Sequence, residues 1–546
     1  MTIALAQINV HVGNFESNLS KMLDFTERAK HQGADLIVFP ELATTGYPPR
    51  DFLEFDDFID RAEWVVNELA KSAVDIGIVV GSPSRNPIVE GKDLYNSVYL
   101  LADGEVKHIQ HKTLLPTYDI FDEYRYFEPA SEWGCVDFQG SKLALVVCED
   151  SWNVGNENPL YTINPMDKML AEKPDMIINV SASPFSYTQA SDRIEVMQAN
   201  VDRYNLPLLY VNHVGAQTEI LFDGGSLVID AKGKVLAELP YFEESLQLVE
   251  TVAIQSGEEL GGEQPKEKIS LIHDALVMGV RNYFEKLGFK RAILGLSGGI
   301  DSALVAVLAS RALGAKNVRC VLLPSQYSSD HSVNDARQLA QNLGCQYDII
   351  PIENAYRAFE ATLQPHFFGT EFGLAEENIQ ARTRAVILMA LSNKFGPILL
   401  NTGNKSEIAV GYSTIYGDMC GGLSVIGDVY KTECYELAKY INREEEIIPN
   451  HIIEKPPSAE LRPNQKDSDS LPPYDELDQV LYQYIEQEQS PQDIIDLGFD
   501  EALVRRTLRL VNINEFKRFQ TPPVLRVSKK AFGMGRRLPI VAKYLS

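Results

Sequence analysis

Short apolar runs alternate with helical segments through the second half of the chain. Residues 291–296 form an apolar run, and residues 302–309, after a glycine-rich turn, have helical character. Further apolar runs lie at 318–324, 347–352 and 398–401, and further helical segments at 269–287, 335–344 and 378–394. Strands that alternate with helices predict a doubly wound, Rossmann-like parallel sheet that binds ligands at the carboxyl ends of its strands.

The first half of the chain also contains strand-like runs and helical spacing. Residues 3–10 alternate like a strand, and residues 14–30 have the spacing of a helix. Further strand-like runs lie at 35–41, 76–81, 97–101 and 142–148. The polar, glycine-bearing stretch at 255–266 indicates an interdomain linker. The expected organisation is a domain at 1–255, a linker at 256–268 and a second domain at 269–546.

Composition narrows the classes of partner. The chain has 546 residues, which implies two or more domains, and a formal net charge of -26, which argues against non-specific binding of nucleic acid. Its six cysteines form no C-x-x-C pattern, which fits reduced thiols rather than disulfides or a zinc site. The sequence has no signal-peptide pattern and no apolar run of about 18 residues. We therefore expect a cytoplasmic protein that binds neither nucleic acid nor membranes.

A glycine-rich turn with an acidic residue follows the apolar run at 291–296. Its sequence is Ser297-Gly298-Gly299-Ile300-Asp301-Ser302. Glycines allow a ligand to approach the backbone, and the N–H groups at a helix start favour phosphate. Asp301 fits beside phosphate if Mg²⁺ lies between them. The turn lacks the lysine of the P-loop and resembles the pyrophosphate-binding loop of the ATP pyrophosphatases. The alternative is an ordinary glycine turn that caps a helix.

Three polar residues at the ends of strand-like runs form a candidate nucleophilic site. Alone, Glu41 is as compatible with a structural ion pair as with a catalytic base, Lys112 with a solvated lysine, and Cys148 with an inert core thiol. Together they supply a base for the thiol proton, a cation for the thiolate and oxyanion, and a nucleophile for a carbonyl carbon.

The strings F-P-E, H-K-x-x-L-P and C-E-D-x-W around these residues resemble the nitrilase, or carbon–nitrogen hydrolase, superfamily over residues 1 to 255. The resemblance implies an α-β-β-α sandwich and a Glu-Lys-Cys site, and neighbouring strings resemble the glutamine-cleaving members. It implies a glutamine pocket lined by Tyr47, Tyr118, Glu149 and Ser183. A basic residue is expected six positions after that serine, where this chain has Gln189, and Arg193, one helical turn on, is a candidate substitute.

Three further motifs in the second half of the chain contain polar and acidic residues suited to ligand binding. They are Glu377–Arg382 at the start of a helical segment, Asn401–Glu407 after a strand-like run, and Tyr416–Gly422, a glycine-rich turn with an acid. Each alone is compatible with ordinary turn chemistry. Together, and with Leu461–Asp467, they resemble the glutamine-dependent NAD⁺ synthetases from about residue 290 to 540.

That resemblance implies a role for each of these loops. ATP would be bound by Gly295, Leu296, Ser297, Gly298, Gly299, Ile300, Asp301, Ser302 and Thr402. Deamido-NAD⁺ would be bound by Asn378, Glu407, Asp418 and Lys517, and Mg²⁺ by Asp301 and Glu407. The family adenylates a nicotinate carboxylate, releases diphosphate, and uses ammonia from glutamine, passed between the domains, to displace AMP. We also expect a homo-oligomer.

The sequence leaves the roles of two further segments undecided and is compatible with two other functions. Residues 458–473 are polar and proline-rich, which predicts a mobile lid or a disordered loop. Basic residues near the C-terminus are compatible with an anion site or with a solvated face; they are Arg526, Lys529, Lys530, Arg536 and Arg537. The alternative functions are another glutamine amidotransferase of the ATP-pyrophosphatase type and a nucleotide-binding regulator with an inactive hydrolase domain.

Overall fold

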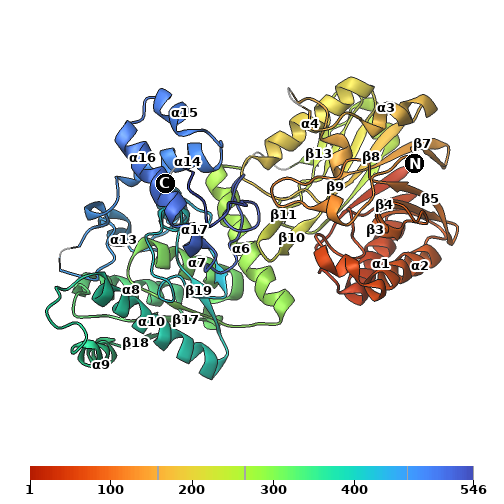
Figure 1. The fold of residues 1–546 in the computed structure, drawn as a ribbon. Coiled ribbons are helices and arrows are strands. Elements are labelled where there is room, and N and C mark those ends of the chain that lie inside the picture. The colour runs from red at the N-terminus through yellow and green to blue at the C-terminus, as the bar shows by residue number, and fades with distance from the viewer. Residues whose placement is uncertain (157–158, 263–265, 464, 545–546) are drawn as a thin grey trace. The chain divides into compact units, whose positions relative to one another are not determined.

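The computed structural model describes residues 1–156, 159–262, 266–463 and 465–544. The chain divides into two compact units, Met1–Pro265 and Lys266–Ser546 (Figure 1). The boundary falls inside the stretch predicted as a linker. Within that stretch, β15 (Gly261–Gly262) pairs with β13 (Val235–Glu238) of the first unit, and residues 263–265 lie outside the described residues.

The N-terminal unit contains two mixed sheets and a hairpin. The first sheet has the order β14-β1-β2-β3-β4-β5, and the second β15-β13-β12-β9-β8-β7-β6. The remaining strand bounds are β1 (Thr2–Gln7), β2 (Leu36–Val38), β3 (Gly77–Arg85), β4 (Leu94–Ala102), β5 (Glu105–His111), β6 (Val136–Phe138), β7 (Ser141–Val147), β8 (Met176–Ser181), β9 (Leu208–Asn212), β12 (Leu227–Ile229) and β14 (Ser245–Glu250), with β10 (Val214–Gln217) and β11 (Ile220–Asp223) forming the hairpin.

Helices cover the outer face of each sheet of this unit (Figure 1). The helices α1 (Phe15–His31) and α2 (Asp56–Ser72) share a buried cluster with alternate residues of the first sheet, such as Ala4 and Ile37. Likewise α3 (Pro165–Met169) and α4 (Gln189–Tyr204) share a cluster with residues of the second sheet. The opposite strand faces, including Leu5 and Leu145, form a third cluster between the sheets. Both sheets are therefore buried on two faces, and the predicted α-β-β-α sandwich is confirmed.

The C-terminal unit is built on one parallel five-stranded sheet with the order β18-β17-β16-β19-β20. The strands are β16 (Ala292–Gly295), β17 (Val318–Leu322), β18 (Gln346–Ile349), β19 (Ile398–Asn401) and β20 (Leu423–Ser424). Strand order reverses between β16 and β19, which is where doubly wound sheets bind ligands. The predicted Rossmann-like sheet is confirmed.

Helices surround this sheet and continue into a C-terminal helical group. They are α6 (Lys268–Leu287), α7 (Ile300–Leu313), α8 (Asp330–Leu343), α9 (Glu353–Leu363), α10 (Leu374–Phe395), α11 (Lys405–Val410), α12 (Lys431–Ile441), α13 (Asn450–Glu454), α14 (Tyr474–Ile485), α15 (Pro491–Asp496), α16 (Glu501–Ile513) and α17 (Glu515–Arg518). Leu388 of α10 packs with Ile293, Val321 and Leu399 of the three central strands. Helix α6 ends at Gly288, whose φ of 76° suits glycine.

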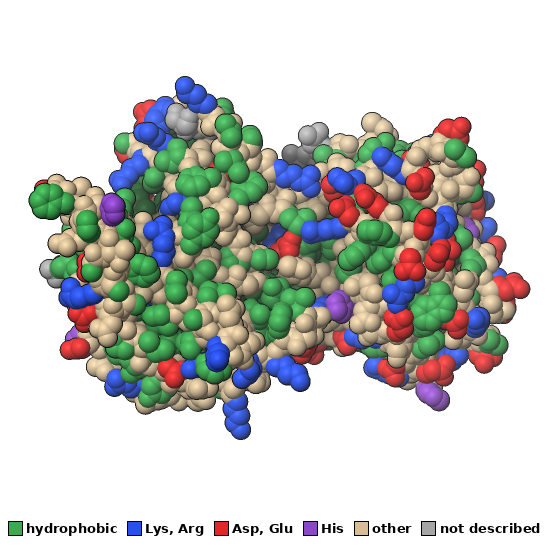
Figure 2. Space-filling view, turned by 60° about the horizontal axis from the view of Figure 1, so that its bottom comes forward, with side chains coloured by type: hydrophobic (Ala, Val, Ile, Leu, Met, Phe, Trp, Pro, Cys, Tyr) green, Lys and Arg blue, Asp and Glu red, His purple; other side chains and the backbone are tan. Residues whose placement is uncertain are grey.

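Charged side chains of both signs lie on the face seen in Figure 2. In Figure 2, acidic and basic side chains are interspersed over the visible face of the N-terminal unit. Among the described residues, no helix is long and apolar enough to cross a membrane.

A buried charge cluster ties the C-terminal segment to α11. The ammonium of Lys405, which is fully buried, lies 2.9 Å from Asp428 and 2.8 Å from Glu486, and it also donates to the Ser528 hydroxyl. Asp428 in turn accepts the backbone N–H groups of Val527 and Ser528. The segment that follows the helical group is therefore held beside the loop that begins α11.

We expect Lys405→Met to lower the free energy of unfolding of the C-terminal unit by about 3–5 kcal/mol, because it leaves two carboxylates buried without their cation. The matched control is Lys530→Met, which removes a pair with the exposed Glu488 and should change stability by less than about 1 kcal/mol. Urea unfolding followed by circular dichroism measures both. Equal, small effects would contradict a stabilising role for the cluster.

Candidate functional site

Cys148 lies at a sharp turn where β7 ends. It is the first residue of the short 3-10 helix η3 (Cys148–Ser151) and is 5% exposed. Its φ of 42° lies in the left-handed region, which a residue with a Cβ rarely adopts. Such backbone strain persists only where surrounding contacts hold it, and it is frequent at functional sites.

The ammonium of Lys112 lies between two carboxylates. Lys112 directly follows β5, and its Nζ is 2.7 Å from Glu41 Oε1 and 2.8 Å from Glu123 Oε1. Lys112 and Glu41 are fully buried. Glu41 Oε1 also accepts a hydrogen bond from Asn96 Nδ2, and its Oε2 accepts the N–H of Ala182. Three donors thus fix the carboxylate in one orientation.

Electrostatics place Glu41, Lys112 and Cys148 in one cluster. Burial raises the pKa of the Cys148 thiol well above its usual value; the Glu41 carboxylate raises it further and Lys112 opposes this. Burial lowers the pKa of Lys112, but the carboxylates of Glu123 and Glu41 raise it well above the usual range overall. Lys112 is therefore a cation, and the resting thiol is neutral and needs a base to become a nucleophile.

Glu123 is a member of this cluster that the sequence analysis missed. It lies in the short 3-10 helix η2 (Glu123–Arg125), and its Oε1 also accepts the hydroxyl of Tyr47 at 2.7 Å. Glu41 was identified because it ends an apolar, strand-like run. The segment around Glu123 contains no such run, so the sequence did not indicate this residue.

The residues predicted to line a glutamine pocket divide into two groups. Tyr118 donates to both oxygens of Glu149 at 3.0 Å, and Tyr161, which the sequence analysis did not identify, donates at 3.1 Å. Burial raises the pKa of Glu149 to about 7, while Lys112 and the two phenols oppose the rise. Separately, Gln189 donates to the hydroxyl of Ser183 at 3.1 Å.

Arg193 does not fit its expected role. Its guanidinium is fully buried and forms two hydrogen bonds to Asp223, with N–O distances of 3.1 and 3.0 Å. A bidentate pair of this kind uses the donors that a substrate carboxylate would need. The expectation that Arg193 replaces a basic residue at position 189 is therefore wrong, and its charge instead compensates the buried Asp223.

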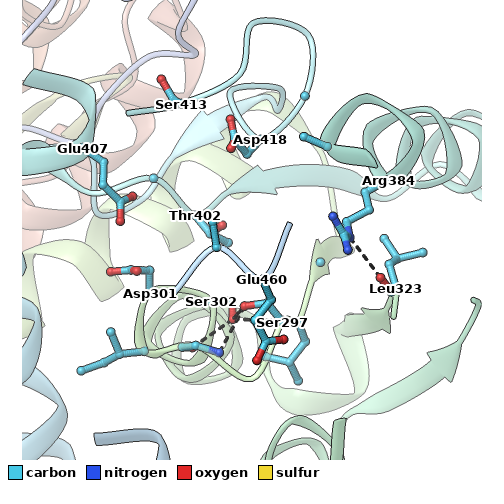
Figure 3. A pocket seen from close by; sticks show the side chains of 18 of the residues that line it. Ser297, Asp301, Ser302, Leu323, Arg384, Thr402, Glu407, Ser413, Asp418 and Glu460 are labelled. Atoms are coloured by element: carbon cyan, nitrogen blue, oxygen red, sulfur yellow. Dashed lines mark hydrogen bonds between the residues drawn. The ribbon is translucent and has the colours of Figure 1, made fainter. Parts of the chain in front are cut away.

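A second site is a cavity of about 350 Å³ in the C-terminal unit. It opens where β16 ends and α7 begins, and residues of β17 and β19 also line it (Figure 3). The lining includes Gly295, Leu296, Ser297, Gly299, Ile300, Asp301, Ser302 and Thr402. Gly298 has a φ of 79°, and a Cβ there would lie 2.2 Å from the carbonyl oxygen of Ser332, so only glycine fits the turn.

Two acidic residues predicted to bind Mg²⁺ lie around a lysine. Lys431 Nζ is 2.6 Å from Asp301 Oδ2 and 3.4 Å from Glu407 Oε1. Burial raises the pKa of Glu407 to about 8, although Lys431 lowers it. Lys431 was missed because it begins α12, far along the chain and after no strand-like run. Asn404 also donates to Asp301, at 3.1 Å.

The donor set is compatible with a phosphate-bound Mg²⁺. Among the described residues, no cluster of three or more His, Cys, Asp or Glu side chains is arranged to hold a metal by itself. Mg²⁺ in nucleotide sites needs only one or two carboxylates, because phosphates and water supply the other oxygens. Asp301 and Glu407 provide those two carboxylates at the cavity wall, on the same side in Figure 3.

Of the four residues predicted to bind the second nucleotide, two line the same cavity and two, Asn378 and Lys517, are not among its lining residues. Asp418 and Glu407 line it. Asn378 accepts a hydrogen bond from Thr414 at 2.8 Å, and Lys517 donates to the carbonyl oxygens of Gly411 and Ser413. Asn378 and Lys517 therefore support the loop at 411–414, part of which lines the cavity.

Part of the segment predicted as a lid or disordered loop forms one wall of the cavity. Residues 456–461 and Asp467 line it. Glu460 accepts hydrogen bonds from Ser329 and Ser332 at the start of α8, and Asp467 accepts the hydroxyls of two tyrosines. Of the string at 461–467, Asn464 lies outside the described residues.

Comparison with known proteins covers both units. The carbon-nitrogen hydrolase family model matches residues 2–258, and the NAD synthase family model matches residues 272–521. The glutamine-dependent NAD(+) synthetase of Synechocystis sp. is 45% identical over 100% of this chain and 99% of its own length. That of Acinetobacter baylyi is 42% identical over 99% of this chain and 98% of its own.

Solved structures give the same result. The structure of glutamine-dependent NAD+ synthetase from Acinetobacter baumannii in complex with ADP is 38% identical, covers 99% of this chain and 98% of its own, and has a TM-score of 0.79. The synthetase from Cytophaga hutchinsonii has a TM-score of 0.85 over 99% of this chain and 98% of its own, and at 22% identity supports the fold alone. Together with the two sites, these likenesses show that the chain belongs to the glutamine-dependent NAD(+) synthetase family.

Proposed function

We propose that this protein makes NAD⁺ from deamido-NAD⁺, ATP and glutamine, with glutamate, AMP and diphosphate as the other products. The observation that carries the proposal is the presence, in one chain, of a buried Cys-Lys-Glu cluster and a cavity whose floor is a glycine turn of the pyrophosphate-binding type. The activity named for the relatives and the ADP bound to the relative from Acinetobacter baumannii support the same assignment.

In the N-terminal unit we assign Cys148 as the nucleophile and Glu41 as the general base. Glu41 takes the thiol proton, and the thiolate attacks the amide carbon of glutamine to form a tetrahedral oxyanion. The ammonium of Lys112 stabilises the negative charge. Glu41 then returns the proton to the leaving nitrogen, ammonia departs, and water hydrolyses the thioester to glutamate. Tyr47, Tyr118, Glu149, Ser183 and Gln189 would bind the substrate.

In the C-terminal unit we assign the turn at 295–302 and Thr402 to ATP. The substrate carboxylate attacks the α-phosphorus, and diphosphate leaves. Ammonia then attacks the acyl carbon, and AMP leaves. Mg²⁺ held by Asp301 and Glu407 would neutralise charge on the phosphates. The ammonium of Lys431 lies at the same place and would compensate phosphate charge. Asn378, Glu407, Asp418 and Lys517 would bind deamido-NAD⁺.

Three further expectations belong to this proposal. Confinement of the released ammonia would raise its effective concentration at the acyl adenylate, so we expect it to be passed between the sites without release to water. We expect a homo-oligomer. The six cysteines are unpaired, which supports a reducing, cytoplasmic environment.

Family membership argues against an amidotransferase with a different acceptor. It does not by itself argue against a regulator with an inactive hydrolase unit, but the intact Lys112 contacts with Glu41 favour an active hydrolase.

We expect Cys148→Ala to abolish glutamine-dependent NAD⁺ formation by several orders of magnitude, because the thioester cannot form. The same variant should still use ammonium salts at mildly alkaline pH. Cys135→Ala is the matched control, since Cys135 lies in the same unit outside the cluster. NAD⁺ release with each nitrogen source measures the effect. Equal loss with both sources would show that Cys148 is structural.

Asp301→Asn should reduce synthesis with glutamine and with ammonia alike, by about 100-fold or more, because it removes charge at the phosphates. Asp330→Asn is the control, because Asp330 also lies in the first turn of a helix that follows a strand of this sheet but is exposed. Steady-state rates at varied Mg²⁺ test the assignment. A near-normal ammonia-dependent rate in Asp301→Asn rejects it.

Lys517→Ala should raise the KM for deamido-NAD⁺ about tenfold, the loss expected for one hydrogen bond to a charged group. The KM for ATP should change less. Because Lys517 also supports the loop at 411–414, Lys517→Arg serves as a charge-conserving comparison. An unchanged KM and kcat for deamido-NAD⁺ in the alanine variant would remove Lys517 from the binding site.

A further inference from the structure

We propose that Asp150 is a positioning residue for the nucleophile: its carboxylate joins the turn that carries Cys148 to the segment that carries Lys112. The inference rests on the proposed hydrolysis of glutamine at Cys148. Asp150 does not touch the reacting atoms, so it acts through the backbone of its two neighbours.

The carboxylate of Asp150 is fully used by backbone donors. Its Oδ1 accepts the N–H groups of Thr113 and Leu114, both at 2.9 Å, and its Oδ2 accepts the N–H of Val147 at 3.1 Å. The residue is 3% exposed. Burial raises the pKa of Asp150 to about 7, against the three N–H donors and Lys112, which lower it.

Each of these donors adjoins a member of the Cys-Lys-Glu cluster. Thr113 and Leu114 directly follow Lys112, and Val147 directly precedes Cys148. One carboxylate therefore links the backbones beside Lys112 and Cys148, through hydrogen bonds that span 37 and 36 residues of the chain. The strand pairings of β7 do not provide this link, because they join β7 to β6 and β8.

The link explains how the strained turn is held. Cys148 has a φ of 42°, a conformation that costs energy for a residue with a Cβ. The bond from Val147 N–H to Asp150 Oδ2 closes this turn from its N-terminal side. The bonds to Oδ1 then fix where the closed turn stands relative to Lys112. A misplacement of about 1 Å between catalytic groups costs about 100-fold in rate.

Asp150→Asn should keep the bonds to Thr113 and Leu114 but remove the bond to Val147. The asparagine keeps an oxygen for Thr113 and Leu114, while its NH₂ group faces the N–H of Val147, and two donors cannot bond. We expect kcat for glutamine hydrolysis to fall about 10- to 100-fold, with the KM for glutamine within about twofold. Ammonia-dependent NAD⁺ formation should be unchanged.

The matched control is Asp230→Asn. Asp230 lies in the same unit, is 5% exposed, and accepts two backbone N–H groups on Oδ1, from Lys232 and Lys234, both at 2.9 Å. It caps the turn between β12 and β13, outside the cluster. Asp230→Asn keeps the oxygen that accepts both N–H groups, so it should fold with little change in stability, kcat or alkylation rate. Asp150→Asn should lose kcat and show slower alkylation of Cys148 by iodoacetamide.

The outcomes separate the two proposals. If the unaltered chain hydrolyses no glutamine, the proposed function fails. If it does, and Asp150→Asn retains kcat and the alkylation rate, the positioning role is overturned. If Asp150→Asn does not fold, Asp150→Glu decides: a folded Glu variant with native kcat overturns the role, and one with reduced kcat and native KM supports it.

Discussion

A lysine ammonium between two carboxylates organises each of the two sites. In the N-terminal unit, Lys112 lies between Glu41 and Glu123 with no exposed surface. In the C-terminal unit, Lys431 lies between Asp301 and Glu407. A buried carboxylate without a partner is costly, so removal of either lysine would leave an uncompensated charge. The geometry of each site is therefore fixed by charge compensation before any substrate binds.

The two ammonium groups have different neighbours and so different chemistry. Lys112 is enclosed by protein and lies in the cluster of a neutral thiol. In the proposed hydrolysis its charge would act only when a thiolate or oxyanion forms. Lys431 contributes to the wall of an open cavity, where the negative charge arrives with the substrate. In the proposed reactions, the first arrangement would stabilise a transition state, and the second would favour binding of an anion.

The alternation of apolar runs such as β16 with helical segments predicted the doubly wound sheet, and the resemblance to the nitrilase superfamily implied the α-β-β-α sandwich. Gly298, whose φ of 79° requires glycine, lies in the turn that the sequence identified. The sequence also predicted Glu41, Lys112 and Cys148, whose structural cluster is described above while their catalytic roles stay predictions. It missed Glu123 and Lys431, since each follows irregular chain and reaches its site only through tertiary contacts. The expected substrate contact of Arg193 was wrong because its actual partner, Asp223 at the end of β11, lies 30 residues away and meets it only in the folded chain.

An acidic chain that binds polyanionic substrates needs its cations in specific places. Arg384 and Lys455 line the same cavity as Lys431, and their side chains are held by the carbonyl of Leu323 and the hydroxyl of Ser332. Burial lowers the pKa of Arg384 to about 10 and lowers that of Lys455, so phosphate charge would stabilise their protonated forms. The formal charge of -26 disfavours non-specific binding of anions over the rest of the surface, and these local cations would favour a nucleotide in the cavity.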